Sequence, residues 1–132
     1  MEELYLTRPG KAHIEALQSY KDDFLAAGNS MDGCGPLRRF DDLNDYLKYT
    51  YDCEKKETCP EGMMPASQFL CIRRTDQKLI GMIQVRLELN DYLRNYGGHI
   101  GYSVCPSERR KGYASWMLHN IMPYCRDQAL RK

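Results

Sequence analysis

A strongly basic loop near the end of the chain carries the residues best suited to chemistry. Three consecutive cations, Arg109, Arg110 and Lys111, come directly before Gly112, and the small Ala114 follows two positions later. Glycine lets an anion approach the backbone closely, and the cations supply full positive charge around the same point. This combination of residue types is typical of a site for a phosphate group.

The elements predicted on either side of this loop support that interpretation. Residues 98–104 have the pattern of a strand ending at Val104, and a helix is predicted from about Gly112 toward Leu130. The first amides of a helix have no intrahelical acceptor, and the helix dipole places partial positive charge there. A strand, a basic loop with a glycine and a helix together predict a site for an anionic cofactor. The alternative is a solvated basic turn before an ordinary helix.

The spacing also resembles motif A of the GNAT N-acetyltransferase superfamily. That motif reads Arg/Gln-x-x-Gly-x-Gly/Ala after a strand, and Arg109, Gly112 and Ala114 occupy its three positions. Val104 and Pro106 stand where the family has its strand end and loop proline. The resemblance implies acetyl-CoA as co-substrate, with its pyrophosphate on the loop amides. The cofactor-binding residues it implies are Val104, Arg109, Arg110, Lys111, Gly112, Tyr113 and Ala114.

The order of predicted elements extends the resemblance over nearly the whole chain. Strands are predicted over 4–7, 69–74, 78–89 and 98–104, and helices over 11–27, from Asp41 or Asp42 to about Tyr51, and from Gly112 onward. The order β-α-α-β-β-β-α is similar to the N-terminal part of the GNAT fold, an α/β fold with a mixed sheet. It implies that residues 1–132 form a single, incomplete N-acetyltransferase domain.

Periodic apolar residues predict which faces of these elements are buried. The expected helix faces are Ile14, Leu17, Tyr20 and Phe24; Leu43, Tyr46, Leu47 and Tyr51; and Ala114, Met117, Leu118, Ile121, Met122 and Cys125. In the strand over 78–89, Ile83, Val85, Leu87 and Leu89 alternate with Gln84, Arg86 and Glu88, which predicts one apolar and one polar face. Gly28 is a natural end for the first helix, and Pro123 predicts a kink in the last one.

Composition excludes several classes of protein. The chain has 132 residues, 42% of them hydrophobic and 28% charged, as expected for one globular domain. A net charge of +1 argues against a general nucleic-acid binder, and no apolar run approaches the ~18 residues that a membrane span needs. The acidic start, Met1-Glu2-Glu3, does not resemble a signal peptide. We therefore expect a cytoplasmic protein without nucleic-acid or membrane partners.

The cysteines and histidines predict neither a disulfide nor a metal site. Six cysteines without a secretory signal are most simply reduced thiols. Cys53 and Cys59 are too widely spaced for a usual zinc knuckle, and His13, His99 and His119 have no partner at metal-ligand spacing. A catalytic cysteine is the less favoured interpretation.

Acetyl transfer to an amine needs a base, because the attacking ammonium must lose a proton. The resemblance implies direct attack on the thioester without an acyl-enzyme, with the carbonyl polarised by backbone near Val104. The candidate bases are His99 and Glu88, with Asp91 a weaker third. A neutral histidine with a pKa near ~6.5 suits this role, although a structural His99 and a solvated Glu88 are the alternatives. The acceptor implied is a small-molecule or peptide amine, with Tyr92, Tyr96 and Tyr102 as possible lining residues.

The family's domain continues beyond the elements predicted here, with a fifth strand and a fourth helix that commonly supplies a tyrosine for the departing thiolate. The sequence ends at Lys132. Two hypotheses follow: an acetyl-CoA-dependent N-acetyltransferase, with or without a partner chain that completes its site, or a truncated, non-catalytic module that binds CoA weakly or only self-associates. We expect an isolated monomer to be a poor catalyst, and a homodimer whose interface includes residues 98–104 and the last helix.

Overall fold

The computed structural model describes residues 3–29, 31–55, 57–59, 65–86 and 100–129, the last four of these by backbone alone. The regular elements within these ranges are β1 (Leu4–Thr7), α1 (Ile14–Ala27), α2 (Leu43–Asp52), β2 (Ala66–Arg73), β3 (Lys78–Arg86), β4 (Ile100–Val104) and α3 (Tyr113–Ala129). Short 3-10 turns lie at η1 (Lys11–His13), η2 (Leu37–Arg39) and η4 (Pro106–Glu108). The predicted order β-α-α-β-β-β-α and the α/β fold class are confirmed.

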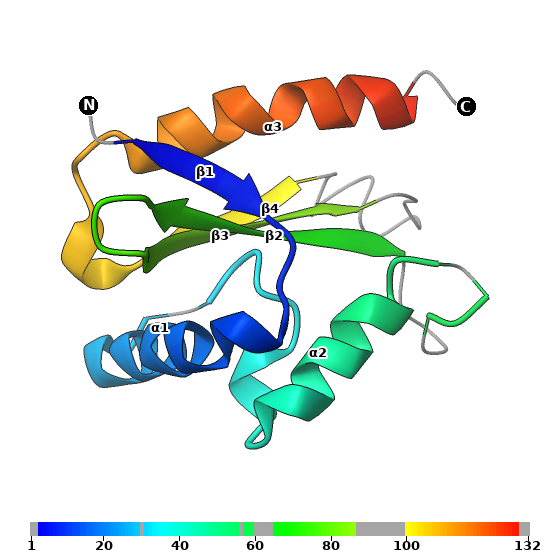
Figure 1. The fold of residues 1–132 in the computed structure, drawn as a ribbon, viewed down its shortest axis with the longest axis horizontal. Helices are drawn as coiled ribbons and strands as arrows, with labels where there is room; N and C mark the ends of the chain where they lie inside the picture. Colours follow the sequence, from blue (N-terminus) through cyan, green and yellow to red (C-terminus); the bar gives the residue numbers. More distant parts are fainter. Residues whose placement is uncertain (1–2, 30, 56, 60–64, 87–99, 130–132) are drawn as a thin grey trace.

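The four strands form one sheet in the order β1-β2-β3-β4 (Figure 1). All pairings between them are antiparallel, so the mixed character predicted for the sheet is not seen among the described strands. β2 and β3 form the predicted hairpin around Asp76, and Ile83 of β3 lies opposite Phe69 on one side and Tyr102 on the other. β4 follows at the edge of this sheet.

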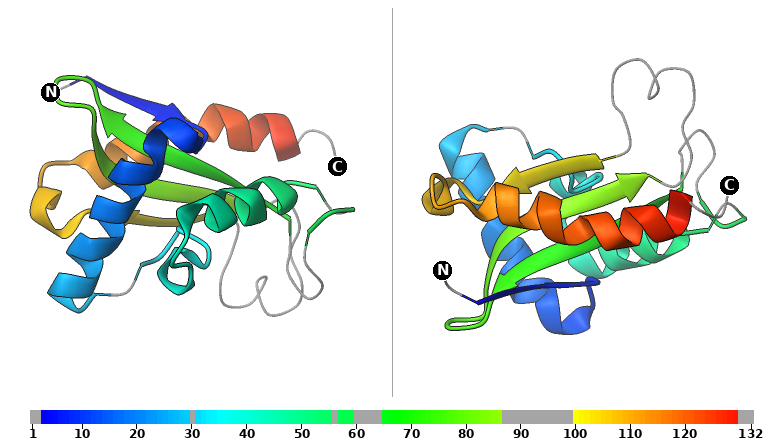
Figure 2. Two further views of the ribbon diagram at one scale, coloured as in Figure 1. Left: turned by 60° about the horizontal axis from the view of Figure 1, so that its bottom comes forward. Right: turned by 90° about the horizontal axis from the view of Figure 1, so that it is seen from above.

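Helices cover both faces of the sheet. α1 and α2 lie on one face and α3 on the other (Figures 1 and 2). Buried side chains accordingly form two clusters, with Met82 in the cluster under α1 and α2 and Ile83 in the cluster under α3. Of the predicted polar face of β3, Gln84 and Arg86 are half-buried, and Met82, which precedes them on that face, is buried. Alternation gives a polar face only where the second face of a strand meets water.

Helix ends follow the predicted signals. Gly28 ends α1 in the left-handed conformation, with φ of 71°, and its amide donates to the carbonyls of Leu25 and Phe24. Asp42 caps α2, because its side chain accepts a hydrogen bond of 2.9 Å from the amide of Asn44. Both positions predicted from sequence are confirmed.

Two helix residues differ from prediction. Tyr51 is 69% exposed and Met122 is 37% exposed, although both were expected on buried faces. α3 runs through Pro123 to Ala129, close to the predicted end of the last helix, and the kink expected at Pro123 stays a prediction. Pro123 is exposed, so its ring does not have to fit the core, and solvent can reach that side of the helix.

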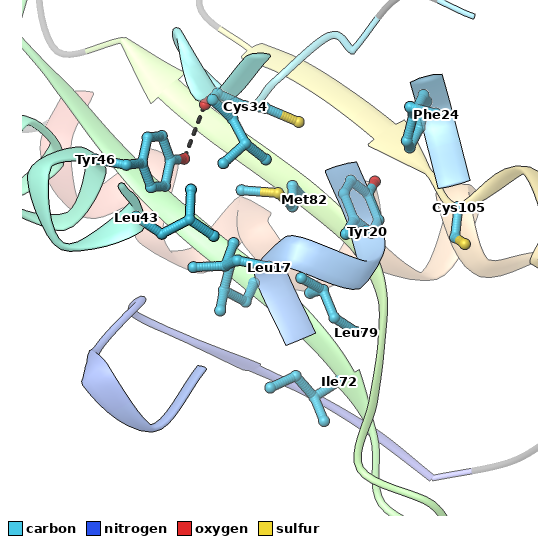
Figure 3. Packing of buried hydrophobic residues seen from close by; sticks show 12 residues of the cluster. Leu17, Tyr20, Phe24, Cys34, Leu43, Tyr46, Ile72, Leu79, Met82 and Cys105 are labelled. Atoms are coloured by element: carbon cyan, nitrogen blue, oxygen red, sulfur yellow. Dashed lines mark hydrogen bonds between the residues drawn. The ribbon is translucent and has the colours of Figure 1, made fainter. Parts of the chain in front are cut away.

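The loop between α1 and α2 is held in place by hydrogen bonds to its backbone, one from α2 and one from the sheet. The hydroxyl of Tyr46 donates to the carbonyl of Cys34 at 2.8 Å (Figure 3). The side-chain nitrogen Nε2 of Gln68 in β2 donates to the backbone carbonyl of Gly33 at 2.7 Å. Both donors are buried, so these bonds fix the loop beside β4.

Candidate functional site

The basic loop leaves the sheet from the end of β4. After Val104, the amide of Cys105 donates to the carbonyl of Ile80 at 2.8 Å, which prolongs the contact with β3 by one residue. The chain then turns through η4, and α3 begins at Tyr113. The predicted succession of strand, loop and helix is therefore present.

Two residues of the loop have left-handed backbone conformations. Gly112 has φ of 82° and Arg110 has φ of 67°. Glycine adopts this conformation without steric cost, whereas a residue with a β-carbon is strained there by about 1–2 kcal/mol. The first helical bond of α3 runs from the amide of Trp116 to the carbonyl of Gly112, at 3.1 Å. Helix geometry gives the amides before it no acceptor within the helix, an arrangement that favours the binding of an anion.

The side chain of Arg109 extends from the loop toward α1. Its Nε donates to the carbonyl of Val104 at 3.3 Å, and its guanidinium carbon is 5.7 Å from the centre of the Phe24 ring. The side chain remains exposed. Its other guanidinium nitrogens can therefore meet an anionic ligand.

A pocket of about 420 Å³ lies along β4 and the start of α3. Its lining residues are Asn29, Asp32, Tyr102, Ser103, Val104, Glu108, Arg109, Arg110, Tyr113 and Ala114. Five of the seven cofactor-binding residues predicted from sequence are in this set, and Lys111 and Gly112 are not. The pocket combines backbone near Val104, two exposed arginines and the beginning of a helix, which suits an elongated ligand with a negatively charged end.

Glu108 is the centre of a buried ionic cluster beneath the loop. The residue is 5% exposed, yet its carboxylate accepts hydrogen bonds of 2.8 Å from Arg73, Lys78 and Lys111. Arg73 is 8% exposed and also bonds Asp76 through Nε and Nη2, at 3.0 and 2.6 Å. A buried carboxylate needs such partners, because an unpaired one would be strongly destabilising.

These partners shift the ionisation of the cluster. Hydrogen bonds from Arg73, and further ones from Lys111 and Lys78, lower the pKa of Glu108 to about 2 despite its burial. The bond to Glu108 raises the pKa of Lys111 above its ordinary value. Glu108 therefore stays ionised and neutralised at neutral pH. The cations paired with Glu108 offset the repulsion between its negative charge and an anion in the pocket.

Ser103, which lines the pocket, forms a buried hydroxyl pair with Tyr20 of α1. The oxygen atoms of Ser103 and Tyr20 are 2.8 Å apart, and the sulfur of Cys34 lies 3.5 Å from Ser103. Burial raises the pKa of Cys34 to about 12, with nearby Asp32 adding to the effect, and burial also raises the pKa of Tyr20. These groups stay protonated at neutral pH and position α1 against β4.

The candidate bases predicted from sequence, His99 and Glu88, and the weaker Asp91, lie outside the described residues, as do Tyr92 and Tyr96. Tyr102 does line the pocket and is 41% exposed.

Sequence reasoning missed four lining residues: Asn29, Asp32, Ser103 and Glu108. Asn29 and Asp32 come from a glycine-rich loop without periodicity, so only the packing of that loop brings them to β4. Glu108 was not considered because attention went to the three cations that follow it. A carboxylate next to a run of basic residues is itself a signal for an ionic cluster.

Two absences are found among the described residues alone. They contain no group of histidine, cysteine or acidic side chains that could hold a metal ion. No helix that they form has the length and apolar character needed to cross a bilayer. All six cysteines are free thiols.

The fold and the pocket define a class of protein: an α/β domain whose sheet edge leads through a basic loop into a helix that starts at a pocket lined by two arginines. A family model described as the acetyltransferase (GNAT) family matches residues 35–132, which is more than half of the chain. The chain belongs to the GNAT acetyltransferase family. That membership supports acyl transfer from acetyl-CoA in general. No curated protein matches the chain.

Proposed function

We propose that the chain transfers an acetyl group from acetyl-CoA to a primary amine of a small molecule or peptide. The observation that carries the proposal is the pocket along β4, lined by Val104, Arg109, Arg110 and the first residues of α3. Amides at the start of α3 would bind the pyrophosphate, and the two arginines would pair with its charge. The thioester would then extend along β4.

The chemistry follows from this placement. An amine with a free electron pair attacks the thioester carbon, the carbonyl oxygen takes up negative charge, and the bond to sulfur breaks to release CoA thiolate. Backbone amide near Val104 is the group available to stabilise the oxyanion. The proton leaves the amine with a base, for which His99 and Glu88 are the candidates. Cys34 is excluded as a nucleophile, because its thiol is buried and its pKa is about 12.

Calorimetric titration with CoA tests the cofactor site. We expect Arg109→Ala to weaken binding by about 1–3 kcal/mol, the range for losing a hydrogen bond to a charged group. Gly112→Asp should abolish binding, because it adds a negative charge and a strained backbone at the loop. Arg39→Ala, which removes an exposed arginine in η2, is the matched control and should leave the affinity unchanged. If the Arg109→Ala and Gly112→Asp variants bind CoA with the affinity of the native protein, the assignment of the loop is overturned.

Catalysis is tested separately from binding. A thiol-release assay with acetyl-CoA and a panel of amines should give CoA release that depends on the amine. Binding of CoA without release for any amine would support the alternative, a non-catalytic CoA-binding module. Replacing His99 and Glu88 one at a time by Gln should identify the base, through loss of the dependence of kcat on pH.

We also propose that the protein is a homodimer whose contact includes β4 and α3. β4 has a hydrogen-bonded neighbour on one side only among the described strands. Tyr102 of β4 and Met122 of α3 are large apolar residues that are more than one-third exposed. Light scattering should give twice the chain mass of 15.4 kDa. A mass of a single chain at micromolar concentration would rule the dimer out.

A further inference from the structure

A single guanidinium group binds both ends of the basic loop. Nη1 of Arg73 donates to Oε1 of Glu108 at 2.8 Å and to the hydroxyl of Tyr113 at 3.2 Å. Glu108 directly precedes the loop 109–112, and Tyr113 directly follows it. Arg73 is the last residue of β2, two strands away from β4 in the sheet. The loop is therefore tied to a part of the chain distant from it in sequence.

Arg73 is itself held in one orientation. Nε and Nη2 bond the carboxylate of Asp76 in the hairpin turn, and Nη2 also lies 3.3 Å from Oε2 of Glu108. With 8% exposure, the side chain cannot turn into solvent. A planar fork fixed at two carboxylates is a rigid anchor, which a flexible lysine would not provide.

The loop needs such an anchor because its conformation is costly. Arg110 has φ of 67°, which L-residues with a β-carbon rarely adopt. A strained conformation persists only where the surroundings enforce it. The anchored groups at Glu108 and Tyr113 fix the start and the end of a four-residue segment, which restricts the intervening backbone.

We propose that Arg73 is a positioning residue for the phosphate-binding loop. It does not line the pocket, and it acts through Glu108 and Tyr113. The proposal rests on the proposed function, because it assigns to the loop the pyrophosphate of CoA. Within the part of the chain that the structure describes, the ion pairs of the cluster join three cations, Arg73, Lys78 and Lys111, to the two carboxylates of Glu108 and Asp76. The anchor thus adds no net negative charge below the anion.

The test compares CoA with pantetheine, which lacks the pyrophosphate and the nucleotide. NMR titration gives both dissociation constants for the native protein, Arg73→Gln and Arg73→Lys. We expect Arg73→Gln to weaken CoA binding by about 10-fold to 100-fold and to leave pantetheine binding unchanged. Arg73→Lys should recover only part of the loss, because it restores the charge and not the fork. The control is Arg74→Gln, an exposed neighbour paired with Glu3, which should match the native protein.

Each outcome decides a separate question. A native protein that does not bind CoA overturns the proposed function itself. Native affinity for CoA in Arg73→Gln overturns the positioning role, as does an equal loss for CoA and pantetheine, which would indicate a general structural role. If Arg73→Gln does not fold, Asp76→Asn decides, because it weakens the hold on Arg73 at a residue that does not line the pocket. A selective loss of about threefold or more for CoA then supports the proposal, and an unselective loss or none overturns it.

Discussion

Gly33 lies so close to β4 that a side-chain carbon on it would be 2.5 Å from the backbone oxygen of Gly101. The same carbon would be 2.5 Å from the Cα of Tyr102. Gly33 also has φ of 70°, a conformation that favours glycine. This contact between a loop and the strand that leads to the pocket places Asp32 at the pocket wall.

Gly33→Ala should therefore destabilise the protein more than an ordinary glycine replacement. The alanine would be strained by the positive φ at position 33, and its β-carbon would clash with the backbone of β4. We expect these two effects to lower the unfolding free energy by about 2–4 kcal/mol. Gly28→Ala is the matched control, because Gly28 has φ of 71° and open space around the added carbon. It should cost only about 1 kcal/mol. Urea unfolding of both variants measures the difference, and equal losses would refute the packing argument.

Arg110→Gly should raise stability and lower CoA affinity in the same protein. Glycine relieves a left-handed conformation at φ of 67°, which we expect to stabilise the fold by about 0.5–1 kcal/mol after the entropy of the unfolded chain is counted. Losing the charge should weaken CoA binding about fivefold or more. Thermal unfolding and calorimetry measure the two effects.

Arg110→Ala separates charge from strain. It loses the same charge and keeps a β-carbon, so we expect the same fall in affinity without the gain in stability. If Arg110→Ala is as stable as Arg110→Gly, the left-handed backbone at position 110 is not strained.

Acid should remove the stabilisation from Glu108 within a defined range of pH. The folded-state pKa is lowered to about 2 from an ordinary value of 4.5, so the folded protein binds fewer protons than the unfolded chain between these values. The contribution is complete above about pH 4.5 and disappears as the pH falls toward 2. A shift of this size corresponds to at most about 3 kcal/mol, and screening at the solvent-exposed lysines reduces our expectation to about 1–2 kcal/mol.

Glu108→Gln isolates this effect from other acidic groups. At pH 6 the unfolding free energy of the variant, measured in urea, should be lower than that of the native protein by about 1–2 kcal/mol, because the Gln amide carries no charge to pair with Arg73. Near pH 2 the native carboxyl is half-protonated and the difference should be small. A difference that stays constant from pH 6 to pH 2 would show that the charge of Glu108 contributes nothing.

Thiol reactivity should follow burial. Cys34 and Cys71 are completely buried, and burial raises the pKa of each to about 12, so neither should react with iodoacetamide in the native protein at pH 7.5. Cys59 and Cys125 are partly exposed and should react first. Peptide mass spectrometry after timed labelling checks the order. Early labelling of Cys34 would mean that the loop around it opens from β4.

Local sequence signals accounted for the elements and for the loop that carries the basic residues. Gly28 and Asp42 marked helix ends because their roles need only nearby backbone. The spacing of Arg109, Gly112 and Ala114, together with the strand and the helix predicted on either side, identified the loop for the same reason. The buried faces were predicted less well, as Tyr51 and Met122 show, because burial depends on which partner a helix meets.

The sequence by itself determined the order of elements, the helix caps and the basic loop between strand and helix, because each depends on residues within a few positions of one another. Only the tertiary structure decided that Arg73 binds both Glu108 and Tyr113, and that Gly33 brings Asp32 to the pocket. These contacts join segments more than 30 residues apart. No local pattern encodes them, because they depend on how the packed helices and the sheet register bring distant side chains together.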